Sequence, residues 1–385
     1  ANPIASMNNW LFRLKASNQC CPGATGTDFY SNPARLTIIQ LPVFTQDPQN
    51  TFACIDGSAT FTALASNASQ YQWQVLQANV YDHVAEWGGH GENDGELRNP
   101  LSVAYDGSNY VYVADAGNSR IQKFNTDGTF ITKWGSAGNG DGQFILPNGV
   151  AVSSSAVYVA DKFNYRVQKF NTSGVFQAKW GTEGYSTGNF KQISGIATDV
   201  DGNVYVSEQH TAIPRVQKFS STGTLLATIG NTTELTSPQG VSVDKNGNVY
   251  ITDNGKVKKY KKTGANSYSY DEDWSSTNPA GLDIDSYVNV YVTDKTGNKI
   301  IKYDYYNNSP SNISYLSTSP VDVAASSDGK MLFACYNNSD LIVKFSPVWT
   351  NLSNGSGYSG VTETKLNINP VSGKNLNEYR LRALR

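Results

Sequence analysis

Acidic side chains recur at one position of a repeated five-residue block and are the first candidates for chemistry. The block resembles Val-Tyr-Val-Ala-Asp, and its aspartates are Asp115, Asp161, Asp253 and Asp294. Asn or Arg often follows a few residues later, so the set could form a polar ring that contacts a ligand. Alternatively, Asp and Asn bond turn amides and hold the hairpin of each repeat. We favour the structural interpretation because the set recurs in most copies.

A metal-dependent or hydrolytic activity would need more ionisable groups than the repeats supply. A hard cation such as Ca²⁺ takes roughly 6–8 oxygen ligands. The residues that open the repeated first strands are Leu101, Asn148, Ser194, Gln239, Ala280 and Val321, with Asp322 next. One carboxylate and a few amides make no such cage, and no nucleophile–base pair is identifiable. We therefore expect no enzyme, catalytic residue, metal ligand or cofactor. The candidate binding residues at these positions are Asn148, Ser194, Gln239 and Asp322.

Two further surfaces could bind a ligand. Tyr303, Tyr305 and Tyr306 could stack on sugars as flat aromatic faces beside amides, although tyrosine is also an abundant strand former here, with 23 residues. A lysine cluster could bind anions; it consists of Lys256, Lys258, Lys259, Lys261 and Lys262. We prefer to place these lysines on a solvated edge strand, where lysine discourages pairing with another sheet.

The elements that must position these residues are β-strands in a repeat. The five-residue block returns with modest changes every 41 to 47 residues, and its six copies end at residues 115, 161, 208, 253, 294 and 336. An alternating apolar run precedes each copy, another follows it, and a fourth run such as GTFITKWG completes the unit. Four antiparallel strands at this spacing predict a blade of a β-propeller.

The outer strand of the last blade is expected to come from the other end of the repeat region. The first-strand motif occurs six times, but the fourth-strand motif follows it only five times, and a sixth copy at 81–88 precedes the first repeat. Trp87 lies 47 residues before Trp134, in phase with the other copies. We therefore predict an all-β chain with a six-bladed propeller over residues 78–356, in which Trp87 and Cys335 share a blade.

The repeated pattern resembles the NHL-repeat family, and it is almost intact in residues 97–181. The resemblance covers about 280 residues, with departures at Glu208 and Tyr336, which stand where other copies have Asp. It implies an NHL-type six-bladed propeller. Lactonase-like hydrolases and an amidating lyase also occur on six-bladed propellers, so a secreted propeller enzyme is the alternative function.

The segments on either side of the propeller resemble parts of immunoglobulin-like β-sandwiches. Residues 43–77, with Trp73 as a core tryptophan, and residues 357–385, with Tyr379 at a tyrosine-corner position, would form one split domain. Residues 2–16 align without a gap on residues 369–383, so residues 1–42 would supply the F and G strands of a preceding domain. Coincidence between two strands of similar pattern is the alternative to this repeat.

The resemblance to immunoglobulin-like domains also predicts how the cysteines pair. A cysteine near the start of strand B can bridge to one just beyond strand F, which for Cys54 would lie past Arg385. We therefore predict no bridge from Cys54 to Cys20 or Cys21 within this chain, and expect Cys335 to be buried and free.

Composition restricts the class of protein. Charged residues make up 16% of the chain, against roughly 25% in an average soluble protein. The net charge of −2 provides no electrostatic attraction for nucleic acid, and no apolar run reaches a membrane-spanning length. The N-terminus lacks signal-peptide features, so we expect any such peptide to have been removed. The propeller with immunoglobulin-like flanks also resembles repeat-built secreted surface adhesins. The resemblance implies an extracellular repetitive surface or filament protein whose propeller is a non-catalytic interaction platform, with neighbouring copies of itself and an unknown protein or glycan as partners.

Overall fold

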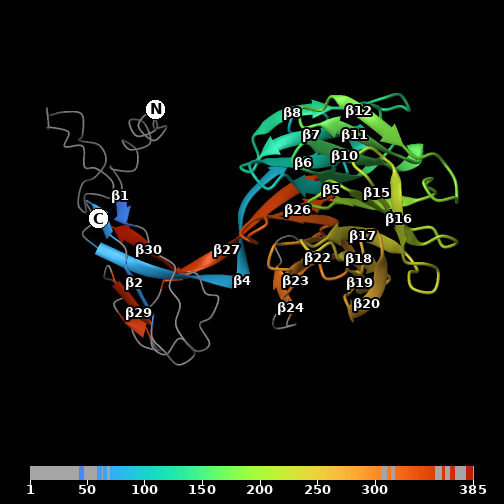
Figure 1. The fold of residues 1–385 in the computed structure, drawn as a ribbon. Helices are drawn as coiled ribbons and strands as arrows, with labels where there is room; N and C mark the ends of the chain where they lie inside the picture. The colour runs from blue at the N-terminus through green and yellow to red at the C-terminus, as the bar shows by residue number, and fades with distance from the viewer. Residues whose placement is uncertain are drawn as a thin grey trace, which may run out of the picture. The chain divides into compact units, whose positions relative to one another are not determined.

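The computed structural model of the chain is built of β-strands (Figure 1). It describes the backbone of residues 43–46, 59–62, 64–66, 70–304, 310–313, 317–351, 358–359, 365–368 and 379–384, and the side chains of residues 80–304, 310–313 and 317–348. The chain divides into two units, one comprising residues 74–352 and 373–379 and the other comprising residues 1–73, 353–372 and 380–385. Within the described residues, no helix is long and apolar enough to cross a membrane.

The larger unit contains six antiparallel sheets in the described part of the chain. Five of them, blades 1 to 5, each use four strands that follow one another in the chain. Blade 1 contains β5 (Pro100–Tyr105), β6 (Tyr110–Asp115), β7 (Arg120–Asn125) and β8 (Phe130–Trp134). Blade 2 contains β9 (Pro147–Val152), β10 (Ala156–Asp161), β11 (Arg166–Asn171) and β12 (Phe176–Trp180). Blade 3 contains β13 (Ile193–Thr198), β14 (Val204–Glu208), β15 (Arg215–Phe219) and β16 (Leu225–Ile229).

Blades 4 to 6 complete the ring. Blade 4 contains β17 (Pro238–Val243), β18 (Val249–Asp253), β19 (Lys256–Lys262) and β20 (Tyr268–Ser275). Blade 5 contains β21 (Pro279–Ile284), β22 (Val290–Asp294), β23 (Lys299–Tyr303) and β24 (Pro310–Ile313). Blade 6 contains β25 (Asp322–Ala325), β26 (Leu332–Tyr336), β27 (Leu341–Asn351) and β4 (Gln70–Gly88), and β30 (Tyr379–Leu384) follows β4 in the same sheet.

The ring closes as the sequence predicts. β4 pairs antiparallel with β27, and Trp87 lies opposite Ile342. Cys335 lies on β26, the neighbour of β27, so Trp87 and Cys335 share blade 6. The first strand of each blade packs beside the first strand of the next, and β25 of blade 6 packs beside β5 of blade 1. The all-β six-bladed propeller is therefore confirmed.

The burial pattern explains why these segments form strands. All six residues of β10 are buried, because the second strand of a blade has a neighbouring strand on each side and a neighbouring blade on each face. The outer strand β8 instead alternates between half-buried and exposed residues, since one of its faces meets solvent. The outer strands therefore alternate between apolar and polar residues, whereas the second strands are apolar almost throughout.

A tryptophan and a glycine form the joint between several blades. Trp134 of blade 1 packs against Phe170 of blade 2, with ring centroids 5.9 Å apart. Gly174, in the outer turn of blade 2, has φ +84°, and a Cβ at that position would lie 2.6 Å from the Trp134 indole. Gly128 meets Trp87 and Gly223 meets Trp180 in the same way. The repeated Trp and the turn Gly are therefore two halves of one contact between adjacent blades.

The smaller unit also contains strand pairs. β2 (Ala59–Thr62) pairs with β29 (Lys365–Ile368), which also pairs with β28 (Tyr358–Ser359). β1 (Val43–Gln46) pairs with β3 (Leu64–Ser66). Segments that precede and follow the propeller in the chain therefore share a sheet. The predicted alignment of residues 2–16 with 369–383 falls largely outside the described residues.

Candidate functional site

The recurring acidic residues are buried and bonded to arginine. Asp115 Oδ2 accepts hydrogen bonds from Arg120 Nε at 2.6 Å and from Gln122 Nε2 at 3.1 Å. Asp115 Oδ1 accepts a bond from the backbone N–H of Arg98 at 2.7 Å. The side chain of Asp115 is 0% exposed and that of Arg120 is 7% exposed, so no ligand reaches the pair from solvent.

The arginine carries the bond network into the loop between two blades. Arg120 donates from its two terminal nitrogens to the carbonyls of Glu92, Asn93 and Glu96. Blades 2 and 3 repeat the arrangement with the pairs Asp161–Arg166 and Glu208–Arg215. These acids therefore have structural partners, but the partners are an arginine and the preceding inter-blade loop rather than the hairpin turn amides that we expected. Asp294 does bond its own turn, through the amides of Thr296 and Gly297.

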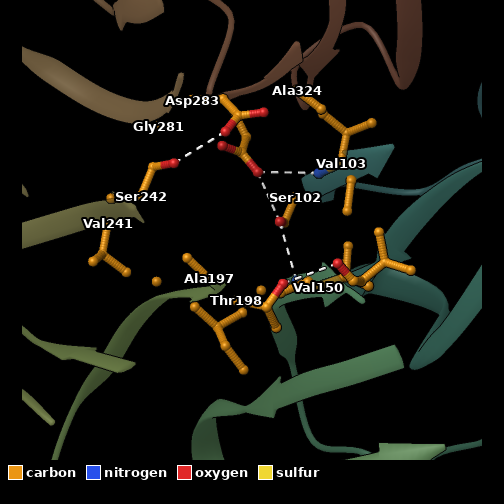
Figure 2. A pocket seen from close by; sticks show the side chains of 18 of the residues that line it. Ser102, Val103, Val150, Ala197, Thr198, Val241, Ser242, Gly281, Asp283 and Ala324 are labelled. Atoms are coloured by element: carbon orange, nitrogen blue, oxygen red, sulfur yellow. Dashed lines mark hydrogen bonds between the residues drawn. The ribbon is translucent and has the colours of Figure 1, made fainter. Parts of the chain in front are cut away.

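The first strands of the six blades surround a cavity of about 860 Å³ on the propeller axis. Figure 2 shows side chains that line this cavity, from several blades of the ring. The four axial residues predicted from the sequence all line it, namely Asn148, Ser194, Gln239 and Asp322. The structure therefore brings together residues that lie up to 174 positions apart in the chain.

Three of these residues bond to neighbouring blades. Asn148 Nδ2 donates to the carbonyl of Ile193 at 3.0 Å, and Ser194 Oγ donates to the carbonyl of Pro238 at 2.7 Å. Gln239 Oε1 accepts a bond from Lys295 Nζ at 3.4 Å. Each residue therefore contributes to the contact between adjacent blades while it also lines the cavity.

Five aspartates, rather than the single one expected, line the cavity. Asp106, Asp199 and Asp201 lie in turns after first strands, whereas Asp322 and Asp283 lie on first strands and bond neighbouring blades. Asp322 accepts hydrogen bonds from Ser102 Oγ at 2.7 Å and from the Val103 N–H at 3.1 Å. Asp283 accepts bonds from Ser242 Oγ at 3.0 Å, drawn in Figure 2, and from the Ala325 N–H at 2.8 Å. The count of one carboxylate was wrong because Asp283 lies three residues beyond the position compared between repeats, on a strand with a different bulge from blade 1.

Burial dominates the acid–base behaviour of both groups. Their location deep inside the ring, where the charged form is poorly solvated, raises the pKa of Asp322 to about 7 and that of Asp283 to about 6. The charge of Asp283 adds to the increase in the pKa of Asp322, and the hydrogen bonds from Ser102 and Val103 oppose it. Two carboxyls that titrate near neutral pH could accept or donate a proton at the cavity wall.

Other groups at the cavity were missed by the sequence analysis. Lys162 and Lys295 follow directly after the second strands of blades 2 and 5, and both line the cavity. A comparison of the residue that follows each five-residue block would have found them. Among the described residues, no three His, Cys, Asp or Glu side chains are close enough together to hold a metal ion.

The predicted aromatic surface lies only partly within the described residues. Tyr303 ends β23, and its hydroxyl donates to the Ser275 carbonyl at 3.3 Å. Its ring packs against Trp274 with centroids 5.6 Å apart, and it lines a second cavity of about 390 Å³. Tyr305 and Tyr306 lie outside the described residues. Tyr303 therefore contributes to packing between blades 4 and 5.

The lysine-rich segment is not an edge strand, which corrects the sequence prediction. β19 lies between β18 and β20, and β20 forms the edge of blade 4. The acidic residues of β20 face the lysines: Lys256 Nζ lies 2.9 Å from Asp273 Oδ1, and Lys259 Nζ lies 2.9 Å from Glu272 Oε1. Cross-strand acids compensate the positive charges, so lysine is tolerated inside the sheet. The prediction considered the lysine strand without the acidic strand that pairs with it.

Cys335 is buried and free, as predicted. Its thiol donates to the carbonyl of Pro100 at 3.2 Å, and burial raises the pKa of the thiol well above its usual value. The predictions for Cys20, Cys21 and Cys54 fall outside the described residues.

Comparison with known proteins identifies the repeat. The family model for the NHL repeat matches residues 97–124 and 235–256. Protein brain tumor of Drosophila melanogaster is 35% identical over 79 residues, which cover 20% of this chain and 8% of that protein. Protein lin-41 of Caenorhabditis elegans is 32% identical over 92 residues, which cover 21% of this chain and 8% of that protein. The chain thus matches only a small part of the length of either relative.

Solved structures share the fold at low identity. A protein provisionally assigned as a gluconolactonase superposes with a TM-score of 0.54 and 11% identity, covering 73% of this chain and all of that one. The WD40 β-propeller domain of Doa1 superposes with a TM-score of 0.50 and 11% identity, covering 69% of this chain and 97% of that one. These similarities show the fold alone. Together with the repeat matches, they establish that this chain carries NHL repeats in a six-bladed β-propeller.

Proposed function

We propose that the chain is part of an extracellular, repeat-built surface or filament protein whose propeller is a non-catalytic platform for binding a protein or a glycan. The observation that carries the proposal is that the buried acidic residues have structural partners. The acids after the second strands of blades 1 to 3 bond arginines, and Asp283 and Asp322 bond amides of neighbouring blades. An arrangement of this kind stabilises a rigid ring and leaves the loops and cavity mouths free for recognition.

The chain outside the propeller supports the surface role. We propose that residues 43–77 and 357–385 form one split immunoglobulin-like domain, that residues 1–42 belong to a preceding one, and that residues 78–356 are an inserted propeller. The pairing of β2 with β29 fits the B and E strands of such a sandwich, and the position of β30 beside β4 fits its F and C strands. The low content of charged residues, 16%, fits a secreted protein.

A secreted propeller enzyme remains the second candidate, and one observation favours it. Asp283 and Asp322 both face the axial cavity, and burial brings the pKa of each close to neutral pH. Carboxyls with raised pKa values are frequent among catalytic acids and bases. The hydrogen bonds from Ser102, Val103, Ser242 and Ala325 favour a structural role for the two groups instead.

One set of assays on the full chain separates the two candidates. We expect no stoichiometric metal by elemental analysis and no turnover of lactone, ester and glycoside substrates. An array of glycans and extracellular proteins should give binding to at least one partner. Turnover that the substitution Asp322→Asn abolishes would overturn the platform proposal in favour of an enzyme. Antibody labelling of intact cells tests the surface location, and labelling only after cell lysis would contradict it.

A further inference from the structure

One mouth of the axial cavity carries polar side chains from four blades. The residue directly after the second strand lines the cavity in blades 2, 3, 5 and 6, where it is Lys162, Gln209, Lys295 and Asn337. The strand register places these residues at the same end of the cavity as Gln239. In blades 2, 4 and 5 the last residue of the second strand lies opposite the proline that begins the first strand. In blades 3 and 6 the end of the second strand likewise lies opposite the start of the first strand, with Glu208 opposite Ile193 and Cys335 opposite Asp322. The mouth therefore combines two ammonium groups with three carboxamides.

Among the described residues, neither lysine at this mouth has a carboxylate within ion-pair distance. Lys162 Nζ lies 5.9 Å from the centre of the Phe163 ring, and Lys295 Nζ donates only to Gln239 Oε1 at 3.4 Å. Lysines on the outer surface differ, since Lys133 and Lys179 each lie 2.5 Å from an aspartate. Burial lowers the pKa of Lys295; the charge of Asp322 opposes this, and repulsion from Lys162 adds a smaller lowering. Two half-buried, mutually repelling cations at a concave site are stabilised by an anion between them.

The carboxamides at the mouth keep unused hydrogen-bonding groups in the described part of the chain. Gln209 uses Nε2 to bond Ser237, Asn337 uses Nδ2 to bond Asn99, and Gln239 uses Oε1 to accept from Lys295. The carbonyl oxygens of Gln209 and Asn337 and the NH₂ group of Gln239 are therefore available to a ligand. A set that both donates and accepts is suited to hydroxyl groups, which also do both.

We propose that this mouth binds an acidic sugar residue, with the sugar carboxylate between Lys162 and Lys295 and its hydroxyls on the carboxamides. The inference rests on the proposed platform function and names the class of ligand for it. Asp322 lies near enough to Lys295 to act on it electrostatically, so the local charge of the three groups suits a monoanion better than a phosphate dianion. The cavity, about 860 Å³, is within the roughly 300–1,000 Å³ typical of small-ligand sites.

Calorimetric titration of the full chain with D-glucuronate at pH 7 tests the site. We expect binding that weakens with added salt, no binding of D-glucose, and weaker binding of inorganic phosphate. Lys162→Gln and Lys295→Gln should each reduce the affinity for glucuronate about tenfold or more, because each removes a charge-assisted bond. Lys133→Gln is the matched control, since it removes the same charge from the outer surface and should leave the affinity unchanged.

Three results would overturn the site: no glucuronate binding, equal binding of glucose, or lysine variants that fold normally by circular dichroism and bind as well as the original chain. Phosphate binding tighter than glucuronate would also overturn it. A glucuronate-terminated oligosaccharide, titrated in parallel, distinguishes a sugar on a glycan from a free sugar acid. Different results would contradict the platform proposal, namely turnover of a substrate or an array on which no glycan or protein binds. Failure of the sugar site and failure of the platform proposal are therefore distinguishable.

Discussion

Ser102 donates its hydroxyl hydrogen to Asp322 Oδ2 over 2.7 Å and thereby joins the first strand of blade 1 to that of blade 6. The same oxygen of Ser102 accepts a bond from the Val150 N–H at 3.1 Å, which extends the link to blade 2 (Figure 2). Asp283 makes the corresponding link from blade 5 to Ser242 of blade 4 and to Ala325 of blade 6. A chain of polar contacts around the axis therefore closes the ring alongside the pairing of β4 with β27.

Asp322 should give the stability of the propeller a distinctive pH dependence. The folded carboxyl has a pKa of about 7 against an ordinary value of 3.8, so between these values the folded state holds a proton that the unfolded chain has released. This contribution to stability is fully present below pH 3.8 and is lost progressively as the pH rises through about 7. Asp322→Asn should therefore flatten the pH dependence between pH 5 and about 7.5, as measured by urea unfolding. A slope unchanged by the substitution would contradict the raised pKa.

The buried acid–arginine pairs should be far more important for stability than the exposed ion pairs. The side chains of Arg166 and Asp161 are 8% and 0% exposed, so Arg166→Gln leaves a buried carboxylate without its cation. We expect a loss of about 3–5 kcal/mol in the free energy of unfolding. Lys179→Gln is the control, because its pair with Asp141 is about half exposed, and it should change stability by less than about 0.5 kcal/mol. Similar losses in the two variants, measured by urea unfolding, would contradict this assignment.

The turn glycines that receive a tryptophan should not tolerate alanine. Gly174 has φ +84° and no room for a Cβ beside Trp134, whereas Gly142 has φ +76° and nothing within 4 Å of the same atom. Gly142→Ala should cost about 1–2 kcal/mol from backbone strain alone. Gly174→Ala should cost clearly more, because the indole must also move. Equal losses in thermal unfolding would show that the blade joint has room to adjust.

Ring closure by β4 should contribute as much to the stability of the propeller as the contact between two consecutive blades. Trp87 packs against Phe124 with centroids 6.0 Å apart, and Trp134 packs against Phe170 with centroids 5.9 Å apart. Both tryptophans are half-buried, so Trp87→Ala and Trp134→Ala should each lower the free energy of unfolding by about 3 kcal/mol. A loss confined to Trp134→Ala in chemical denaturation would mean that the closing strand contributes little to the stability of the ring.

Most of the propeller can be predicted from the sequence, because its strands repeat at short range. The alternating apolar runs, the turn glycines and the spacing from Trp87 to Trp134 are local properties, and they predict the blade, the number of blades and the origin of the closing strand. The lysine-rich strand shows the limit of such patterns. Lys256 and Lys259 indicate an exposed edge by themselves, and only their pairing with Asp273 and Glu272 of β20 explains why they lie inside a sheet.

The sequence by itself determined the all-β six-bladed architecture and the first-strand residues, such as Asn148 and Asp322, that reach the axis. Tertiary structure alone decided which groups meet there. Lys162 and Lys295 come from blades 2 and 5. Asp283 accepts hydrogen bonds from the Ser242 hydroxyl of blade 4 and from the Ala325 N–H of blade 6. Periodicity encodes which face of a strand is buried, because that depends on the near neighbours of each residue. The charges and hydrogen bonds at the axis depend instead on how six blades pack around a ring, which no single repeat contains.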